Sequence, residues 1–203
     1  MFHPEDDGMT FRREHGIEDK FIVLYAGAHG VSNDMGVILK AANILRDKED
    51  IQFIFLGDGK EKSNLQAHAN QMDLENVSFL PPVPKGEMSS ALAAADVCVA
   101  ILKPIEMYKT VYPNKVFDYM AAGRCVILAI DGVIREVVNE AQAGIFVQPG
   151  DSEKMAEAIQ GLYDEPLNRE SMGKNGRQYV EENFDRNMLA EELSGFMGNM
   201  VNQ

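Results

Sequence analysis

The sequence predicts an α/β protein in which a doubly wound, parallel sheet of six strands carries helices on both faces. Three observations predict this fold. Short apolar runs recur along the 203 residues, stretches with helical spacing of apolar residues separate these runs, and no internal repeat or low-complexity linker breaks the alternation. Strands that alternate with helices of this length specify right-handed βαβ crossovers, and repeated crossovers produce a parallel sheet within one domain.

The predicted strands are apolar runs bounded by Gly, Pro or Asp. They are rich in Val, Ile and Phe and mostly do not alternate with polar residues, which is typical of strands covered on both faces. In chain order they are Phe21–Gly27, Ile51–Gly57, Val77–Leu80, Asp96–Leu102, Cys125–Ile130 and Gly144–Val147.

The predicted helices lie between and after these strands. Apolar residues recur at helical spacing from Ile38 to Leu45, Leu65 to Met72, Met88 to Ala95, Val116 to Ala121 and Met155 to Leu162. Residues 168–183 and 185–203 are predicted to form two further, C-terminal helices. The last of them carries an apolar stripe that includes Leu193 and Met197, which packs either on its own sheet or against a surface outside this chain.

The charge balance argues against nucleic acid as the main partner. The chain has 19 basic and 32 acidic residues, a formal net charge of -13, and no basic run longer than Arg12-Arg13. A protein of this charge repels a polyanion. A small phosphorylated ligand is still compatible with the sequence, because a few backbone N–H groups at a helix N-terminus can bind it whatever the net charge.

The cysteines and the first residues indicate the class of protein. Cys98 and Cys125 lie inside apolar runs without CxxC or CxxH spacing, which predicts buried thiols rather than a metal site or a secreted disulfide framework. No apolar stretch approaches the roughly 20 residues that span a bilayer. Residues 1–20 are polar and mixed in charge, unlike a signal peptide. We therefore expect a soluble, cytoplasmic domain without a bound metal.

The loop after the first predicted strand is a candidate ligand site, because open α/β sheets bind ligands at the carboxyl ends of their strands. Gly27 and Gly30 allow the backbone to approach a ligand, and the polar residues 32–34 can cap the next helix. Free N–H groups there would bind a phosphate, or the glycines would form only a tight turn. His29 is a further candidate in this loop, where a lone histidine is usually solvated.

The next two strand ends give weaker signals. Asp58 stands between two glycines and either accepts hydrogen bonds from a ligand or caps the following helix. Val83 lies within Pro81-Pro82-Val83-Pro84, where proline makes the loop rigid. Such a loop suits a wall for a flat base and serves equally well as a plain connector.

The most informative segment is KPIEMYKTVYPNKVFDYMAAG, residues 103–123. Pro113 suits the first position of a helix, and Gly123 suits its C-terminal stop. A short helix is therefore predicted over Pro113–Ala122.

The first turn of this helix brings Asn114 and Lys115 to the strand ends. Hydrogen-bond donors, a cation and the positive end of a helix dipole then converge, as a diphosphate requires. Asp118 lies one turn further on. Its carboxylate either accepts two hydroxyls of a ribose or sugar, or only complements the helix dipole.

Several of these segments together resemble a known family. YAGAHG, FLGDGKEK, NVSFLPPVP, PNKVFDYMAAGRCVI and AGIFVQPGD resemble, in order and spacing, the C-terminal half of retaining glycosyltransferases of the GT-B fold. This large group includes bacterial polysaccharide and lipid-linked sugar transferases. The resemblance covers about residues 11–195 and depends on the order of the motifs more than on any one of them.

The resemblance implies a Rossmann-like domain that binds a nucleotide-diphospho-sugar, most of all a UDP-sugar. Residues 1–20 would be an interdomain linker remnant and a short helix, residues 21–183 the donor-binding domain, and residues 184–203 a helix that packs toward an N-terminal domain outside this chain. That domain would bind the acceptor, supply the acceptor-side catalytic groups and make any contact with the inner membrane face. This chain alone would bind donor without turning it over.

The family's acidic pair, with seven residues between its members, places the ribose-binding acid on Asp118. Thr110 stands at the position of the other acid, and the nearest acid is Glu106, which fits only a longer loop. Either Glu106 or Thr110 is the candidate contact to the donor sugar.

The basic pair that often follows the first strand in this family is absent, since His29 and Met35 stand about where Arg and Lys are expected. The resemblance therefore implies that Lys115 and the backbone of residues 27–30 bind more of the diphosphate. It also implies that the sugar retains its anomeric configuration and that no divalent metal is required.

Three alternatives remain open at this point. A dinucleotide-dependent oxidoreductase would need GxGxxG and an acid about 20 residues beyond it, and the first strand instead ends in Gly27-Ala28-His29-Gly30. A non-catalytic interaction module would use the C-terminal stripe as a docking helix. A nucleotide-sugar epimerase shares the same fold.

Overall fold

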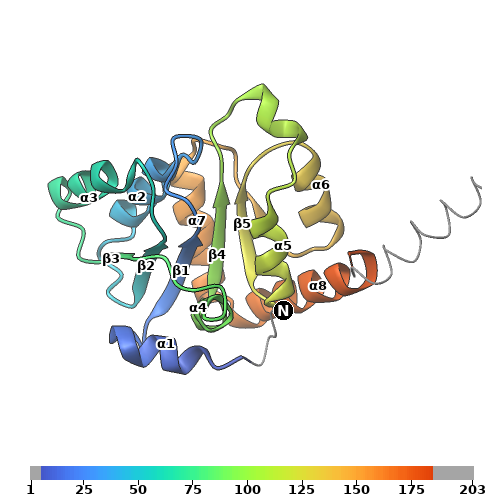
Figure 1. The fold of residues 1–203 in the computed structure, drawn as a ribbon, viewed down its shortest axis with the longest axis horizontal. Coiled ribbons are helices and arrows are strands. Elements are labelled where there is room, and N and C mark those ends of the chain that lie inside the picture. The colour runs from blue at the N-terminus through green and yellow to red at the C-terminus, as the bar shows by residue number, and fades with distance from the viewer. Residues whose placement is uncertain (1–5, 185–203) are drawn as a thin grey trace, which may run out of the picture.

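The six predicted strands are all present in the computed structural model, which describes residues 6–184 (Figure 1). They are β1 (Phe21–Ala26), β2 (Ile51–Leu56), β3 (Val77–Leu80), β4 (Val97–Ile101), β5 (Cys125–Ala129) and β6 (Gly144–Phe146). All except β3 are slightly shorter than predicted. The first two end before Gly27 and Gly57, whose φ angles of 137° and 141° leave the strand region.

The sheet is entirely parallel, with the strand order β3-β2-β1-β4-β5-β6. The order reverses between β1 and β4, which pair directly. In a doubly wound sheet the crevice for a ligand opens at the carboxyl ends of these two strands. The predicted fold class is therefore confirmed, and the topology gives one place where a ligand is expected.

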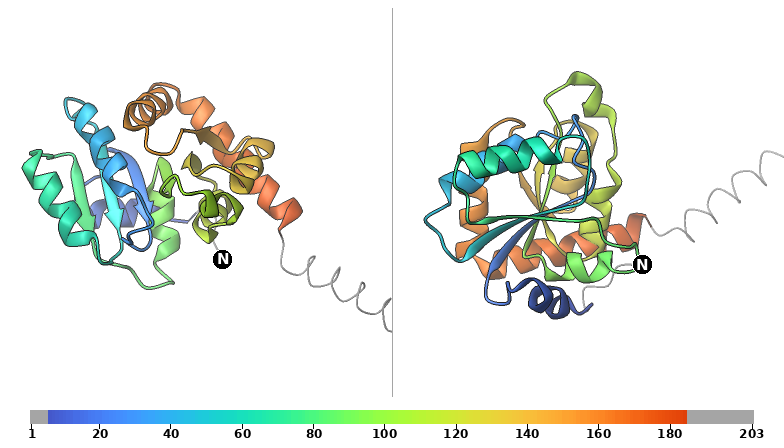
Figure 2. Two further views of the ribbon diagram at one scale, coloured as in Figure 1. Left: turned by 90° about the horizontal axis from the view of Figure 1, so that it is seen from above. Right: turned by 60° about the vertical axis from the view of Figure 1, so that its left-hand side comes forward.

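Helices cover both faces of the sheet, as Figure 2 shows in the view from above. Helices α2 (Met35–Ile44), α3 (Lys62–Gln71) and α7 (Ser152–Asp164) contribute to one core cluster. The opposite cluster includes residues of α1 (Gly8–His15), α4 (Met88–Ala94), α5 (Asn114–Ala121) and α6 (Val133–Glu140). A 3₁₀ helix, η1 (Glu106–Thr110), follows β4, and α8 (Pro166–Asn183) packs against both clusters.

Strand β1 illustrates why the strands are continuous apolar runs. Phe21, Val23 and Tyr25 belong to the core with α2, α3 and α7, whereas Ile22 and Leu24 belong to the core with α4, α5 and α6. Because successive side chains point to opposite faces, a strand between two helical layers has no solvent face that would favour polar residues.

Helix α5 begins at Asn114, one residue later than predicted. Pro113 is its N-cap, in the extended conformation with ψ 121°, rather than its first helical residue. The predicted stop is confirmed, since Gly123 has a left-handed φ of 67°. Lys115 is therefore the second residue of α5, at the positive end of the helix dipole.

The remaining predictions about the fold concern the cysteines, the C-terminal helices and membrane-spanning segments. Cys98 and Cys125 are buried free thiols as predicted, and burial raises the pKa of both. Helix α8 begins at Pro166, two residues before its predicted start. The predicted helix over 185–203 and its stripe lie outside the described residues. Within residues 6–184, no helix is both long enough and apolar enough to cross a bilayer.

The amino ends of the strands are held together by one carboxylate. Oδ2 of Asp96 lies 2.8 Å from a guanidinium nitrogen of Arg12 on α1 and accepts the backbone N–H of Ile22 at 2.8 Å. Its Oδ1 lies 3.6 Å from Arg169 on α8. Arg12 also donates to the carbonyl oxygens of Ala94 and Lys20. The first and last described helices and strand β1 therefore share one anchor.

Replacing this anchor should destabilise the fold. We expect Asp96→Asn to lower the free energy of unfolding by about 2 kcal/mol, because two guanidinium groups lose a half-buried anionic partner. Guanidinium chloride denaturation measures the change. Glu157→Gln, which removes an exposed ion pair with Lys154 on α7, is the matched control and should cost about 0.5 kcal/mol or less. Equal effects of the two substitutions would rule out Asp96 as an anchor.

Candidate functional site

The chain segments that leave β1 and β2 run side by side beyond the end of the sheet. The N–H of Gly27 donates to Leu56 at 2.9 Å, the N–H of His29 donates to Asp58 at 2.8 Å, and the N–H of Glu61 donates to His29 at 3.0 Å. A Cβ on Gly57 would collide with the carbonyl oxygen of Gly27. The glycines therefore permit a close backbone approach, beyond what a simple tight turn requires.

His29 is buried by this approach, and the expectation that it is solvated is wrong. Its exposed fraction is 0%, and its ring lies among those of Tyr25, Phe55 and Phe79, with centroid distances of 6.0 to 6.3 Å. Neither ring nitrogen has a hydrogen-bond partner among the described residues. Burial and the positive charge of Lys62 lower the pKa of His29 to about 4, so its imidazole is neutral at pH 7.

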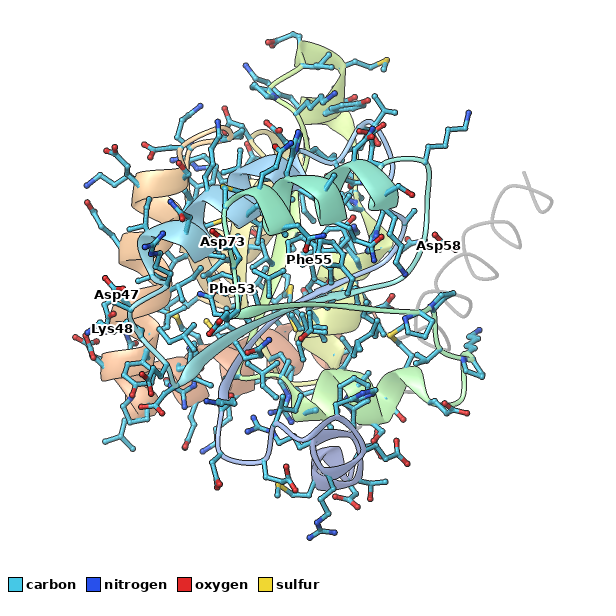
Figure 3. All side chains as sticks on the ribbon, turned by 90° about the vertical axis from the view of Figure 1, so that its left-hand side faces the viewer. Asp47, Lys48, Phe53, Phe55, Asp58 and Asp73 are labelled. Atoms are coloured by element: carbon cyan, nitrogen blue, oxygen red, sulfur yellow. The ribbon has the colours of Figure 1, made fainter. Side chains whose placement is uncertain are left out.

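Asp58 is exposed, and its role as a helix cap is excluded. Its Oδ1 accepts the N–H of Gly59 at 2.7 Å, whereas α3 starts at Lys62 with Glu61 as its N-cap. Figure 3 shows Phe53 and Phe55 of β2 in the interior and Asp58 at the periphery. Of the two predicted roles, only that of a hydrogen-bond acceptor for a ligand stays open.

The rest of the loop after β1 is fixed by Asn33. Its side-chain amide donates to the carbonyl oxygen of Ala28 at 3.0 Å, and its backbone N–H donates to Gly30 at 3.1 Å. Asp34 is the N-cap of α2 but makes no side-chain cap bond. Met35 is 1% exposed and belongs to the core. Position 35 therefore supplies no cation to the site.

Lys115 connects α5 to the loop after β1. Its Nζ donates to the hydroxyl of Tyr25 at 2.8 Å and lies 4.2 Å from the centroid of that ring. A Cβ on Gly27 would be 3.3 Å from Nζ, so the ammonium lies directly over this glycine. Burial lowers the pKa of Lys115 to about 8. The start of α5 therefore lies at the carboxyl end of β1, as the segment 103–123 predicts.

The two other candidates on α5 flank this lysine. Asn114, the first residue of the helix, is exposed, and Asp118 is partly exposed one turn further along. Residues separated by four positions lie on the same side of an α-helix. The side chains of Asn114 and Asp118 therefore share one face of α5.

Glu106 and Thr110 lie together on η1, which stands above the carboxyl ends of the strands in Figure 1. Both are exposed. Glu106 pairs with Lys109 at 2.9 Å, and the Thr110 hydroxyl donates to the carbonyl oxygen of Met107 at 3.1 Å. The backbone N–H of Lys103 donates to Ser32 at 2.9 Å, so the loop that carries η1 is joined to the loop after β1.

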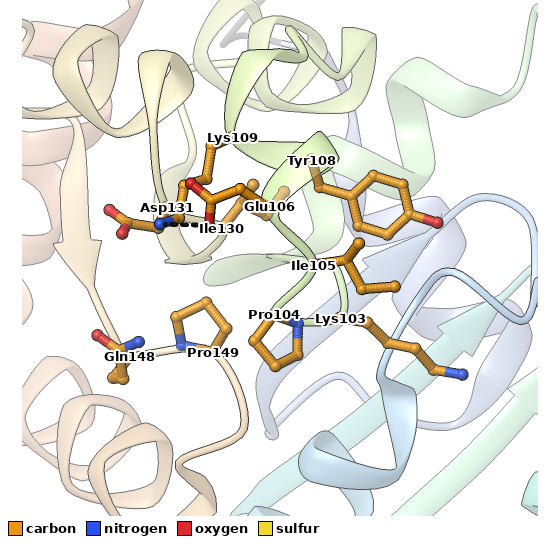
Figure 4. Close-up of a pocket in the computed structure, with 10 residues that line it drawn as sticks. All are labelled: Lys103, Pro104, Ile105, Glu106, Tyr108, Lys109, Ile130, Asp131, Gln148 and Pro149. Carbon is orange, nitrogen blue, oxygen red and sulfur yellow. Dashed lines mark ion pairs between the residues drawn. The ribbon is translucent and has the colours of Figure 1, made fainter.

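Glu106 also lines a pocket of about 160 Å³ (Figure 4). The pocket lies between residues 103–106, 108 and 109 on one side and Ile130, Asp131, Gln148 and Pro149 on the other, and Thr110 does not line it. A larger hollow of about 480 Å³ lies between α2 and α3 and contains none of the predicted site residues. Of these two pockets in the described part of the chain, the one beside η1 includes a predicted site residue.

Val83 is partly buried against the core cluster that contains α4 and α5, and Pro82 and Pro84 beside it are exposed. This position fits either predicted role, a wall for a base or a connector. Among residues 6–184, no group of three or more His, Cys, Asp or Glu side chains is placed to hold a metal ion.

Two residues of this region escaped the sequence analysis. Tyr25 lies in a buried strand, where its hydroxyl gave no distinct signal. Lys62 donates through Nζ to the carbonyl oxygens of Gly57 at 2.8 Å and Leu80 at 3.1 Å and so joins the ends of β2 and β3. Tyr25 and Lys62 lie within YAGAHG and FLGDGKEK, two of the segments that carry the family resemblance, and this is a signal that could have identified them.

The buried imidazole of His29 should make stability depend on pH. The unfolded histidine takes up a proton near pH 6.5 and the folded one only near pH 4, so the stability from the neutral ring is full above pH 6.5 and is lost toward pH 4. Between pH 6.5 and 4.5 we expect wild type to lose about 2 kcal/mol more than His29→Leu. Urea denaturation at several pH values measures this, and parallel losses would exclude a neutral, buried His29.

Comparison with known proteins identifies the family. The family model described as Glycosyl transferases group 1 matches residues 8–179. The GDP-mannose-dependent monoacylated alpha-(1-6)-phosphatidylinositol monomannoside mannosyltransferase of Corynebacterium glutamicum is 27% identical over 202 residues, which cover 96% of this chain and 51% of that protein. The chain spans about half the length, or less, of this and the next curated relatives that it matches.

Solved structures agree on the fold. Anabaena Alr3699/HepE in complex with UDP has a TM-score of 0.81 at 20% identity, with 94% of this chain and 53% of that chain covered. The C-terminal domain of LpcC, a group 1 family glycosyl transferase from Francisella tularensis, has a TM-score of 0.78 at 19% identity, with 91% and 96% covered. These findings do not favour the epimerase alternative. On the match of its family model over most of the sequence, this chain belongs to the glycosyl transferases group 1 family.

Proposed function

We propose that this chain is the donor-binding half of a retaining glycosyltransferase and that it binds a nucleotide-diphospho-sugar at the carboxyl ends of β1 and β4. The observation that carries the proposal is the ammonium of Lys115 over Gly27, at the end of β1 beside the point where the strand order reverses. A cation, the start of a helix and a glycine backbone meet there, and together they attract a diphosphate.

The proposal assigns the predicted residues to parts of the donor, with His29 contributing only its backbone because its ring is buried. Lys115, Asn114 and the backbone of residues 27–30 bind the diphosphate. Within this loop the N–H groups of Ala28 and Gly30 are the donors that we propose, because those of Gly27 and His29 already donate to Leu56 and Asp58. Asp118 accepts the hydroxyls of the ribose one helical turn away. Either Glu106 or Thr110, on a loop joined to the loop after β1, contacts the donor sugar, and each side chain has a partner within η1. Asp58 and Val83 flank the base.

The base is the least constrained part of the donor. HepE is described with UDP and with UDP-glucose, whereas the Corynebacterium relative is described as GDP-mannose-dependent. UDP-sugar is the donor that we propose first. The diphosphate would be neutralised by Lys115 and the α5 dipole.

The chain's length relative to its relatives supports a role for a second domain. We propose that an N-terminal domain of the full-length enzyme binds the acceptor and makes any contact with the inner membrane face. Polysaccharide or lipid-linked glycan synthesis is the process that we propose for the whole enzyme.

Substitution of the cation and the acid should weaken nucleotide binding. Calorimetric titration with UDP, GDP, ADP and uridine tests this. We expect Lys115→Met to weaken the best nucleoside diphosphate by roughly 10- to 100-fold and Asp118→Asn by about tenfold, because each loses a charged hydrogen-bonding group. Lys115→Met should leave the uridine affinity unchanged.

Lys20→Met is the matched control. Lys20 precedes β1 at the opposite edge of the sheet, where its Nζ donates to the carbonyl oxygen of Glu49. This variant should bind nucleoside diphosphates as wild type does. Full affinity in Lys115→Met, or tight binding of a nicotinamide dinucleotide without competition by UDP, would refute the proposed site.

The chain alone should bind donor without transferring its sugar, because we place the acceptor-side groups on the other domain. Release of nucleoside diphosphate from the best-bound sugar nucleotide measures this. We expect release at the rate seen in buffer. Rapid turnover by the 203-residue chain would place the catalytic groups within it.

A further inference from the structure

Lys115 reaches across the edge of the sheet from one helical layer to the other. Its helix, α5, contributes Val116, Tyr119 and Met120 to one core cluster. Tyr25, which accepts the hydrogen bond from the ammonium, belongs to the opposite cluster. The lysine side chain must therefore pass over the end of β1, where Gly27 provides the room.

The hydroxyl of Tyr25 has a fixed direction. It donates its proton to the carbonyl oxygen of Ala28 at 2.8 Å, the same carbonyl that receives the amide of Asn33. With its proton used there, the hydroxyl presents a lone pair to Lys115 Nζ. Burial raises the pKa of Tyr25, so the hydroxyl stays protonated and keeps this arrangement. One group thus links the start of α5 to the loop after β1.

The aromatic ring adds a second contact. Nζ of Lys115 lies 4.2 Å from the ring centroid, within the range in which a ring face attracts a cation. A lysine side chain normally loses much rotamer freedom when it binds an anion. A lysine already held by a hydroxyl and a ring loses less on binding, which favours affinity.

We propose that Tyr25 is a positioning residue that holds the Lys115 ammonium over Gly27, ready for the diphosphate of the donor. The inference rests on the proposed function and deepens it, since it names the group that sets the direction of the main cation. Tyr25 acts through Lys115 and is not itself assigned a contact to the ligand.

The test is a double-mutant cycle with a matched control. Tyr25→Phe keeps the ring and removes the hydroxyl. Tyr119→Phe is the control, because it removes another buried hydroxyl, whose hydrogen bonds go to the backbone of the same strand, at Ala26, rather than to Lys115. Both variants, Lys115→Met, and the double variant Tyr25→Phe/Lys115→Met are titrated with UDP, GDP and uridine.

We expect Tyr25→Phe to weaken the best nucleoside diphosphate by about tenfold and to leave uridine unchanged, as loss of a hydrogen bond to a charged group predicts. In the Lys115→Met background the same substitution should have no further effect, because it acts only through the lysine. If Tyr25→Phe weakens nucleotide binding as much in Lys115→Met as in wild type, the positioning role is overturned and a general loosening of β1 is indicated.

The titration of Lys115, followed by NMR of its Cε carbon, tests the contact without any ligand. Tyr25 on β1 and His29 in the next loop are titratable groups that interact with it, and His29 stays neutral near pH 8. The charged form of Lys115 loses an acceptor in Tyr25→Phe, so its titration midpoint should fall. It should stay unchanged in Tyr119→Phe. An unchanged midpoint in Tyr25→Phe would overturn the inference.

The outcomes also separate the two proposals. If Lys115→Met weakens binding and Tyr25→Phe behaves like Tyr119→Phe, the donor site stands and the positioning role fails. If Lys115→Met binds as wild type does, both fail, because there is then no diphosphate contact for Tyr25 to orient.

Discussion

The close approach of the loops that follow β1 and β2 is the constraint on which the candidate site depends. Gly57 and Gly59, with φ angles of 141° and 156°, bring their backbone so near to Gly27 and His29 that a side chain on either would collide. This approach buries the imidazole of His29 and leaves the space over Gly27 to Lys115. A larger residue at position 57 would therefore displace the loop after β1, including Gly27, over which the Lys115 ammonium lies.

The charge at this edge of the sheet is opposite in sign to the net charge of the chain. The net charge is -13, yet the ammonium of Lys115 and the positive end of the α5 dipole meet over one glycine. His29 stays neutral there because burial and Lys62 disfavour its charged form. Local placement, more than net charge, decides whether an anion is attracted, since charges beyond a Debye length are largely screened.

The sheet could be predicted from sequence because its strands lie between two helical layers and are mostly apolar, with Gln52 in β2 and Ser78 in β3 as the polar exceptions. The start of α5 was predictable to one residue from Pro113 and Gly123, both of which restrict the backbone. The burial of His29 and the bond between Tyr25 and Lys115 were not. Both depend on how loops and layers distant in sequence meet in space, and no local pattern of residues encodes such a meeting.

The carboxylate of Asp96 joins Arg12, Ile22 and Arg169 at the amino ends of the strands, away from the loops that surround Lys115. The anchor that stabilises the fold and the candidate ligand site thus lie at opposite ends of the same strands. Changes in the loops around Lys115 therefore leave the ion pairs and the hydrogen bond of Asp96 at the opposite edge of the sheet in place. Under the proposed function, substitutions around Lys115 therefore change which donor binds without loss of the contacts that Asp96 makes.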